Sequence, residues 1–400
     1  MADGARLIPP TDITKPFTDA IAEAERMVAA AEFIQTEQDL AEGYEYLAGS
    51  IRAIVQLAWA FDKRHPFFVS STGPYTKMGL DNPDTLYYSA NIVDDAEYVV
   101  TGNRGTTTDL AFQIIRGDYT ADEVPAGDQA FDDRQLEIDA DGSFVVRFGP
   151  PKTDPEPNYF ALAPGATTLS VREVYSDWTT ERRGRIRIER ADTVGTAPVE
   201  PDIAMLTKRY RVAGKMLLSR INTWFNFPKW FYLDLPVNTF TAPRLTPGGL
   251  ATQFSSVGHY DLADDEAMII TVPKSAAPYQ GFQLGSMWYI SLDYVNHQTS
   301  LNSSQAQVDP DGNIRMVLTR NNPGLANWIE TTGRQRGILQ FRWQRTDAPI
   351  TADLGPIAQV VSIADVAQHL RYYQDNRIDD AGWADRIAAR QRGFAERMLG

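Results

Sequence analysis

Three side chains that can orient a polar substrate or exchange a proton with it fall within the sequence NPDTLY, residues 82–87. An amide, a carboxylate and a phenol in one short turn can hold a hydroxyl or carbonyl group and move a proton to or from it. Asp84 and Tyr87 are therefore candidate catalytic residues, and Asn82 is a candidate binding residue. A structural role stays open, because Asn and Asp beside proline form self-bonded turns and tyrosine often packs with its hydroxyl satisfied.

A second group of such side chains lies in PYQGFQLGSMWYISLDY, residues 278–294. If this stretch is one strand, alternation puts Tyr289, Ser291 and Asp293 on one face and Trp288 on the other. The first face would offer a carboxylate and hydroxyls to a ligand. Asp293 and Tyr289 are therefore further candidate catalytic residues, and Trp288 is either a binding residue or part of the core.

Imidazole chemistry has few candidates, because the chain contains 4 histidines and no two of them have the spacing of metal ligands. His259 and His297 lie in the same predicted sandwich and could converge with Asp261 or Asp293. His297 is therefore a candidate binding residue, although structural or surface histidines are the competing interpretation. We expect neither a metal site nor a cofactor.

Composition argues against several classes of protein. With 38 Lys and Arg against 52 Asp and Glu, the net charge of −14 would repel a phosphate backbone, so no nucleic-acid partner is expected. Cysteine is absent, which removes disulfides and thiol nucleophiles and fits a reducing compartment. No segment resembles a signal peptide or a membrane span, so we expect a cytoplasmic protein. The motifs of serine hydrolases, P-loops and dinucleotide sites are also missing.

The elements that must position these residues alternate between helical and sheet-like sequence. The expected order is an N-terminal helical region at 1–66, a first β-sandwich at 67–195, a helical linker at 196–236, a second β-sandwich at 237–348 and C-terminal helices at 349–400, with an amphipathic helix from Val360. The predicted fold class is mainly β with helical additions, built on two tandem antiparallel β-sandwiches.

The two sheet regions match each other at one offset. DDAEYVVT at 94–101 aligns with DDEAMIIT at 264–271, and Phe112 aligns with Phe282, in both cases 170 residues apart. Ordered matches at a single offset indicate two copies of one module, so we predict an internal duplication.

Arg172 and Arg342 are equivalent under the same offset of 170 residues and stand on the polar faces of predicted strands. Either guanidinium could anchor an anionic substrate group with two hydrogen bonds. Each could equally well do no more than screen the sheet. Both are candidate binding residues.

The motif at 82–87 resembles the Asn-Asn-Asp-Thr-Leu-Tyr signature of domain of unknown function 1254, with Pro83 in place of the second Asn. The second copy resembles the usual companion of that domain, domain of unknown function 1214, in residues 286–294, the pair Asn327 and Trp328, and the strand of Arg342. The resemblance implies two sandwiches of jelly-roll type and no particular reaction. It adds Asn327 and Trp328 to the candidate binding residues.

Residues 203–232 combine six Lys and Arg, no acidic residue and an aromatic end. This composition suits a helix on an anionic membrane surface or the mouth of a site for a lipophilic substrate. The alternative is an interdomain helix whose charges meet acidic N-terminal helices and whose aromatic rings fill the core.

Together these features lead us to expect a cofactor-independent enzyme of hydrolase or lyase type that acts on a small organic substrate, either lipophilic or carbohydrate-like. A noncatalytic protein that binds a small ligand is the first alternative. A peripheral membrane or scaffold protein that acts through weak contact of residues 203–232 with anionic lipid is the second. A homo-oligomer is compatible with all three.

Overall fold

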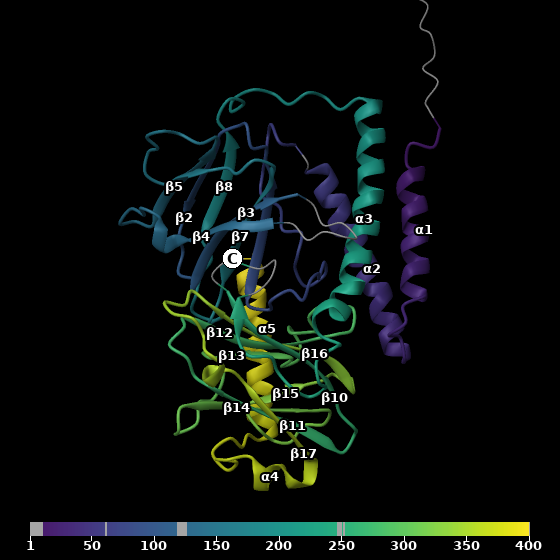
Figure 1. The fold of residues 1–400 in the computed structure, drawn as a ribbon, viewed down its shortest axis with the longest axis vertical. Helices are drawn as coiled ribbons and strands as arrows, with labels where there is room; N and C mark the ends of the chain where they lie inside the picture. Colours follow the sequence, from purple (N-terminus) through teal and green to yellow (C-terminus); the bar gives the residue numbers. More distant parts are fainter. Residues whose placement is uncertain (1–10, 61, 118–125, 246–249, 251–252, 400) are drawn as a thin grey trace, which may run out of the picture.

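The computed structural model describes the chain except for residues 1–10, 61, 118–125, 246–249, 251–252 and 400. Figure 1 shows two β-sandwiches arranged along the long axis of the molecule, with helices beside the first sandwich and the last helix running along the second. The fold is mainly β with helical additions, as predicted from the sequence. None of the helices in the described residues is both long and apolar enough to cross a membrane.

The first sandwich contains two four-stranded sheets, ordered β1-β7-β3-β4 and β6-β5-β2-β8. Its strands are β1 (Thr85–Asn91), β2 (Tyr98–Asn103), β3 (Asp109–Arg116), β4 (Ala126–Asp132), β5 (Ser143–Gly149), β6 (Tyr159–Ala161), β7 (Ala166–Val174) and β8 (Arg185–Arg190), with the short helix η1 (Asp133–Gln135) after β4.

The second sandwich repeats this arrangement with the sheets β10-β16-β12-β13 and β15-β14-β11-β17, and β9 adds one strand beside β10. Its strands are β9 (Arg244–Leu245), β10 (Phe254–Asp261), β11 (Glu266–Pro273), β12 (Tyr279–Gly285), β13 (Ser300–Asn302), β14 (Asn313–Thr319), β15 (Trp328–Glu330), β16 (Arg336–Gln344) and β17 (Ile357–Ser362).

Strand register confirms the duplication residue by residue. Phe112 pairs with Val171 in the first copy, and the residues 170 positions later, Phe282 and Phe341, pair in the second. The partners on β2 and β5 and those on β11 and β14 obey the same offset. Phe112 and Phe282 are both buried in the core of their own sandwich. An ancestral sheet module was therefore doubled, and both halves bury the same alternate side chains.

Two details differ from the sequence-based prediction. The helix expected from Val360 is wrong for residues 360–362, because the β-branched run of β17 completes a sheet by pairing with β11. The C-terminal region then continues through η3 (Ile363–Asp365) and α4 (Val366–His369) to α5 (Asp380–Leu399), with η2 (Ala352–Leu354) before β17. The sheets are also not purely antiparallel, since β6 joins β5 and β15 joins β14 in parallel.

The remaining helices, α1 (Lys15–Ala29), α2 (Glu37–Trp59) and α3 (Ile203–Phe231), pack together in one apolar cluster. A capping box fixes the start of α2, where Thr36 and Asp39 exchange hydrogen bonds between side chain and backbone. Trp288 of the second copy enters this cluster. Its indole donates to the carbonyl of Asp39 at 2.8 Å and lies so close to Gly43 that a Cβ there would be 2.4 Å from the ring.

Candidate functional site

Residues 77–87 lie between the two copies and contact both. The backbone N–H of Leu80 donates to the carbonyl of Tyr289 at 2.6 Å, and the carboxylate of Asp81 accepts from the Ser291 hydroxyl at 2.9 Å. Lys77 donates to the carbonyls of Ser291 and Leu292 at 2.8 and 2.7 Å. The segment that carries the predicted motif is therefore fixed to the second sandwich before it enters β1 of the first.

Asp84 forms the centre of a buried polar network at this junction. One carboxylate oxygen accepts from the indole of Trp178 and the other from the hydroxyl of Tyr279, both at 2.7 Å. The side-chain oxygen of Asn82 also accepts from Tyr279, at 3.0 Å. Burial raises the pKa of Asp84, in opposition to the hydrogen bond from Tyr279, and burial together with the charge of Asp84 raises the pKa of Tyr279 well above its usual value. This carboxyl and phenol form a close pair that could share a proton.

Two arginines of α5 cover the same network. The guanidinium groups of Arg390 and Arg397 lie 4.6 and 4.2 Å from the ring centroid of Trp178. Arg390 donates to the carbonyl of Tyr294, and Arg397 donates to the carbonyl of Pro83. Burial lowers the pKa of Arg390 to about 10. The last helix therefore binds both copies at the point where they meet.

Tyr87 and Arg172 lie beside this network but contact each other rather than Asp84. They are partners in the β1–β7 pair, and the guanidinium carbon of Arg172 is 5.8 Å from the centroid of the Tyr87 ring. The hydroxyl of Tyr87 accepts from the backbone N–H of Asn82 at 2.8 Å. Arg342, the equivalent of Arg172, donates to the side chain of Gln283 and to the carbonyl of Leu80. Arg342 thus holds protein oxygens at the junction.

The strand predicted through residues 286–294 is wrong beyond Gly285, where β12 ends. The chain turns sharply, and Tyr289 has a φ of 57°, so the expected alternation of faces does not occur. Trp288 and Tyr289 are both buried in different apolar clusters. Asp293 is exposed and accepts from the backbone N–H groups of Val295 and Asn296 at 3.0 Å. Asp293 and Tyr289 therefore do not form a pair.

The other predicted binding residues lie apart from Asp84. His297 contacts the carboxylate of Glu330 at 2.8 Å. Asn327 donates to the carbonyls of Gln307 and Arg315, which joins the loop before β15 to β14. Trp328 donates to the carbonyl of Thr319 and packs against Trp383 of α5. These contacts stabilise the second copy and its helix.

A cavity of about 390 Å³, which includes open solvent at its mouth, lies where the end of α3 crosses β10 and β16. Its lining residues are Phe227, Phe231, Tyr232, Arg244, Leu245, Ser255, Val257, Tyr289 and Gln340. The ring of Phe227 stacks on that of Tyr289 with centroids 4.7 Å apart. The walls are thus mainly aromatic and aliphatic.

One wall of this aromatic cavity carries a chain of polar groups. The hydroxyls of Tyr232 and Tyr289 are 2.8 Å apart, and Tyr232 donates to the side-chain oxygen of Gln340 at 3.0 Å. Because Tyr232 gives its proton to Gln340, Tyr289 must donate to Tyr232. Burial raises the pKa of Tyr232 to about 12, so its phenol stays protonated at neutral pH.

Sequence reasoning proposed Tyr289 as a site residue, and one of its interpretations made the aromatic end of residues 203–232, with Phe227, Phe231 and Tyr232, the mouth of a site for a lipophilic substrate. It missed the cavity residues of the second sandwich other than Tyr289. Gln340 shares the polar face of β16 with Arg342, and that alternation was a usable signal. Tyr232 ends the aromatic stretch of residues 203–232, but nothing local distinguishes it from its neighbours. Ser255 and Val257 come together with it only through the fold.

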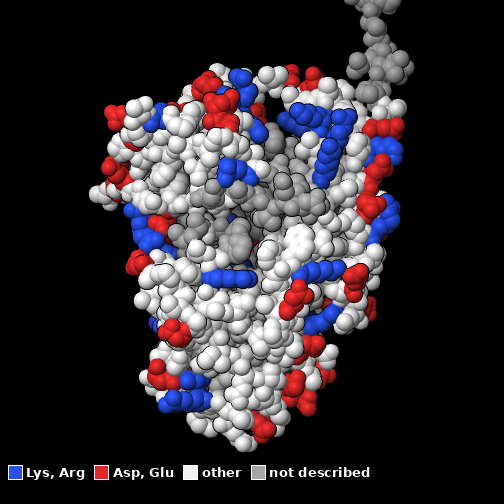
Figure 2. All heavy atoms as spheres, in the orientation of Figure 1, with Lys and Arg blue, Asp and Glu red and all other residues white. Residues whose placement is uncertain are grey.

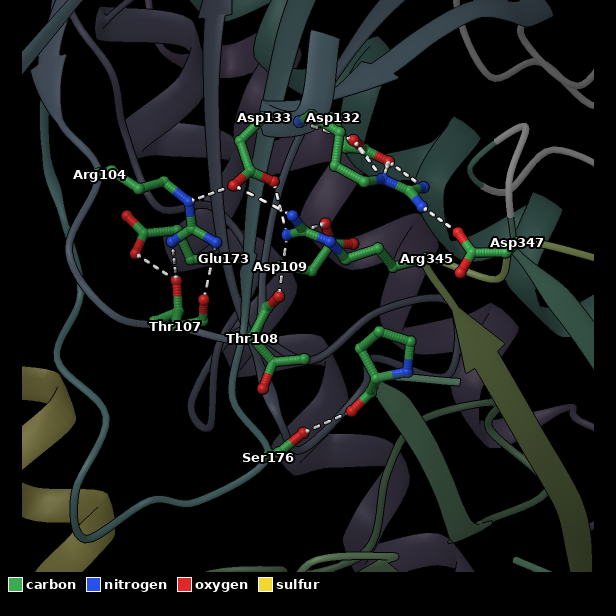
Figure 3. A network of polar contacts seen from close by, with 12 residues as sticks. Arg104, Thr107, Thr108, Asp109, Asp132, Asp133, Glu173, Ser176, Arg345 and Asp347 are labelled. Atoms are coloured by element: carbon green, nitrogen blue, oxygen red, sulfur yellow. Dashed lines mark hydrogen bonds and ion pairs between the residues drawn. The ribbon is translucent and has the colours of Figure 1, made fainter. Parts of the chain in front are cut away.

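Figure 3 shows a further network of acidic and basic residues where the end of β16 meets the first copy. Arg345 donates to Asp133 at 2.6 Å and to the carbonyl of Thr108 at 3.0 Å, and Arg104 donates to Asp133 at 2.7 Å. Asp109 is buried beside them. Burial and the charge of Asp132 raise its pKa to about 7. Over the described ranges, no cluster of three or more His, Cys, Asp or Glu side chains has the arrangement of a metal site.

Comparison with known proteins gives a structural likeness and no activity. No family model and no curated protein matches the chain. A crystal structure of an uncharacterized protein from Burkholderia cenocepacia matches with a TM-score of 0.78 and 26% identity, over 88% of this chain and 97% of that one. A protein from Vibrio parahaemolyticus matches with a TM-score of 0.42 and 11% identity, over 86% of this chain and 100% of that one. The chain is thus similar in fold to the Burkholderia protein over nearly its whole length.

Proposed function

We propose that this protein binds a small, largely apolar organic molecule in the aromatic cavity between α3 and the second sandwich. The observation that carries the proposal is the cavity itself, which combines four aromatic rings with the hydrogen-bonded chain of Tyr289, Tyr232 and Gln340. Ligand sites of this kind use apolar walls for affinity and a few fixed polar groups for orientation. A ring or short chain that carries one hydroxyl group fits this chemistry.

The lining supports binding rather than catalysis as the function of the aromatic cavity. Among the described residues that line it, none carries a carboxyl group or an imidazole, and the one cation, Arg244, is exposed. General acid–base catalysis near neutral pH needs a group whose pKa is close to the working pH, whereas the Tyr232 phenol is held at about 12.

A second candidate function, an acid–base enzyme of hydrolase or lyase type, is favoured by one specific observation. Asp84 and Tyr279 are 2.7 Å apart, and burial raises the pKa of both. Enzymes place such pairs in dry surroundings with cations nearby, as Arg390 and Arg397 are here. The same contacts also join the two copies, which is a sufficient structural reason for them. We therefore place the enzymatic function second to ligand binding.

We also propose that the chain belongs to the paired family of domains of unknown function 1254 and 1214. The supporting residues are the motif at 82–87 and the Asn327–Trp328 pair, and the two-sandwich fold has the architecture that the resemblance implies. Residues 82–87 lie at the junction of the two copies. If the motif is a signature of this family, its position favours a role in joining the two sandwiches.

Isothermal titration with a panel of hydroxylated aromatic and aliphatic compounds tests the binding proposal. Val257→Trp adds a ring to the cavity wall and should abolish binding. Val145→Trp is the matched control, because this side chain is 46% exposed on the outer face of the first sandwich, and it should leave binding intact. Tyr289→Phe should weaken binding of the hydroxylated compounds about 5- to 30-fold, the worth of one hydrogen bond. Equal affinity for the wild type and Val257→Trp would overturn the proposal.

The two candidate functions predict different results for Asp84→Asn. If the protein is a binder, this variant keeps its affinity for the cavity ligand, provided that its circular dichroism spectrum shows a folded chain. If Asp84 is a catalytic base, turnover of any substrate found in the panel is lost while affinity is retained. Turnover that depends on Asp84 would favour the enzymatic function over the binding function.

A further inference from the structure

The cations of α3 divide into two groups with different surroundings. Arg220 is buried and donates to the carbonyls of Thr76 and Lys77 at 2.9 Å, and Lys229 forms an ion pair with Glu32 of the neighbouring chain segment at 2.9 Å. These cations behave as expected for an interdomain helix. The aromatic rings near the end of α3 also fill the core, as Trp224 does beside Tyr289.

The other four cations lie in the first half of α3: Lys208, Arg209, Arg211 and Lys215. Arg209 is half-buried, and the remaining three form the basic face. Lys208, Arg211 and Lys215 are exposed and follow helical spacing, so they project from one side of the helix. None of the four forms an ion pair or a side-chain hydrogen bond with the part of the chain that the structure describes. Figure 2 shows basic side chains gathered over this half of α3.

Their isolation is informative because acidic groups are abundant in this protein, which has a net charge of −14. The opposite face of the helix carries Ala213 and Leu217, which are buried against α1 and α2. Packing therefore fixes the orientation of the helix and holds the three positive charges of Lys208, Arg211 and Lys215 outward together. Like charges this close repel one another unless an anionic partner compensates them.

Exposed apolar side chains stand at the start of the same helix. Val199 is 79% exposed in the segment before α3, and Ile203, its first residue, is 45% exposed. Basic side chains next to exposed aliphatic ones are the combination that binds anionic lipid, because headgroups take the charges while aliphatic groups enter the interface. A purely acidic protein partner would have no use for the aliphatic part.

We propose that the basic face of α3, with Val199 and Ile203, binds anionic lipid headgroups at a membrane surface. The contact is peripheral and reversible, since the apolar side of α3 stays packed in the protein. It would orient the molecule with the start of α3 toward the membrane. This inference is independent of the aromatic cavity, which lies at the other end of α3.

Co-sedimentation with vesicles tests the proposal. The intact protein should bind vesicles of phosphatidylcholine mixed with phosphatidylglycerol, should not bind pure phosphatidylcholine, and should be released when ionic strength rises from about 0.05 M to about 0.5 M. Each cation near a membrane contributes roughly a fivefold change in partitioning, so Lys208→Gln/Arg211→Gln/Lys215→Gln should weaken binding about 100-fold. Ile203→Ser should cause a smaller loss.

The matched control removes the same charge elsewhere. Arg185, Lys274 and Arg392 are exposed and well separated in sequence, so Arg185→Gln/Lys274→Gln/Arg392→Gln changes the net charge equally without touching α3. Unchanged vesicle binding by this control supports the proposal. An equal loss in both triple variants, or no binding by the intact protein to the mixed vesicles, would overturn it. Binding to an acidic polypeptide but not to the vesicles would also overturn it.

Discussion

The two sandwiches share strand order and register, yet they use their outer surfaces differently. At equivalent positions 170 residues apart, the first copy has Val145, which is 46% exposed, and the second has Arg315, which is buried. Arg315 pairs with Asp309 at 2.5 Å and with Asp311 at 2.8 Å. The hydrophobic face of the module was retained in both copies, while the polar face of the second became an internal surface.

The same contrast explains where the candidate sites lie. Strand β16 is buried along almost its whole length, and the 77–87 segment and the residue after α3, Tyr232, contact its polar side chains. Its polar residues must therefore bond inside the protein, and Gln340 and Arg342 do so. In the first copy the equivalent strand β7 keeps Arg172 only partly buried. The junction and the aromatic cavity are thus products of burying one copy more deeply than the other.

Substitutions in the core that the two copies share should lower the free energy of unfolding most, and by equal amounts in the two copies. Phe112→Ala and Phe282→Ala each remove a fully buried ring from equivalent positions, so each should lower the free energy of unfolding by about 3–5 kcal/mol. Urea unfolding of both variants measures this. A large loss in one copy with almost none in the other would show that the two cores do not contribute alike.

Exchanging the residues at the equivalent positions 145 and 315 should destabilise the second copy strongly and the first copy very little. Arg315→Val leaves Asp309 buried without its cation and should cost about 3–5 kcal/mol, whereas Val145→Arg adds a charge to an exposed position and should cost less than about 0.5 kcal/mol. Similar losses of stability for the two exchanges in chemical denaturation would show that the outer faces of the two copies are equally buried.

Asp109 should make the junction of the copies sensitive to pH. Its pKa is about 7 in the folded protein against an ordinary value of 3.8, so between these values the folded state keeps a proton that the unfolded state releases. Stability from this group is therefore full at low pH, falls as pH rises through the window, and is constant above it.

Removing the Asp109 charge tests this dependence. Asp109→Asn should raise the free energy of unfolding by about 2–4 kcal/mol at pH 8 and change it little at pH 4. Thermal unfolding across this pH range is the measurement. Asp347→Asn is the control, because that carboxylate is exposed and, among the described residues, pairs with Arg134 alone. A pH profile identical to that of the wild type would exclude a raised pKa for Asp109.

The smallest expected effect concerns the contact between the copies. Tyr279→Phe removes the hydroxyl that bonds Asp84 and Asn82 but keeps the ring, so it should cost about 1.5–3 kcal/mol, the usual range for a hydrogen bond to a charged group. Tyr260→Phe is a matched control in the same copy, since the Tyr260 hydroxyl is buried without a hydrogen-bond partner among the described residues. Equal costs for the two would mean that the Asp84 contact adds nothing.

The duplication was predictable because a period of two along each strand and one constant offset leave a clear trace in sequence. Pairings such as Val100 with Val146 and Ile270 with Met316 follow from that offset. The motif with Asn82 and Asp84 was also visible, as a group of reactive side chains in one turn.

The features that the sequence did not predict depend on contacts between distant segments of the chain. The turn at Tyr289 follows from packing against Leu80 and α3, and alternation alone carries no sign of it. Arg397 reaches the carbonyl of Pro83 across 314 residues of chain. Tyr232 meets Gln340 only when α3 is placed on β16. Local periodicity carries no information about such long-range contacts. The aromatic cavity and the contacts of the α5 arginines could therefore be identified only from the three-dimensional structure.

In its native host the protein should carry a small organic ligand in the aromatic cavity beside the second copy. A crystal structure of the protein purified from its native host tests this most directly. We predict density for a largely apolar molecule between Phe227 and Val257, with a polar group within hydrogen-bond distance of Tyr289 or Tyr232. A cavity that holds only water, with ligand density next to Asp84 instead, would show that the aromatic cavity is not the ligand site.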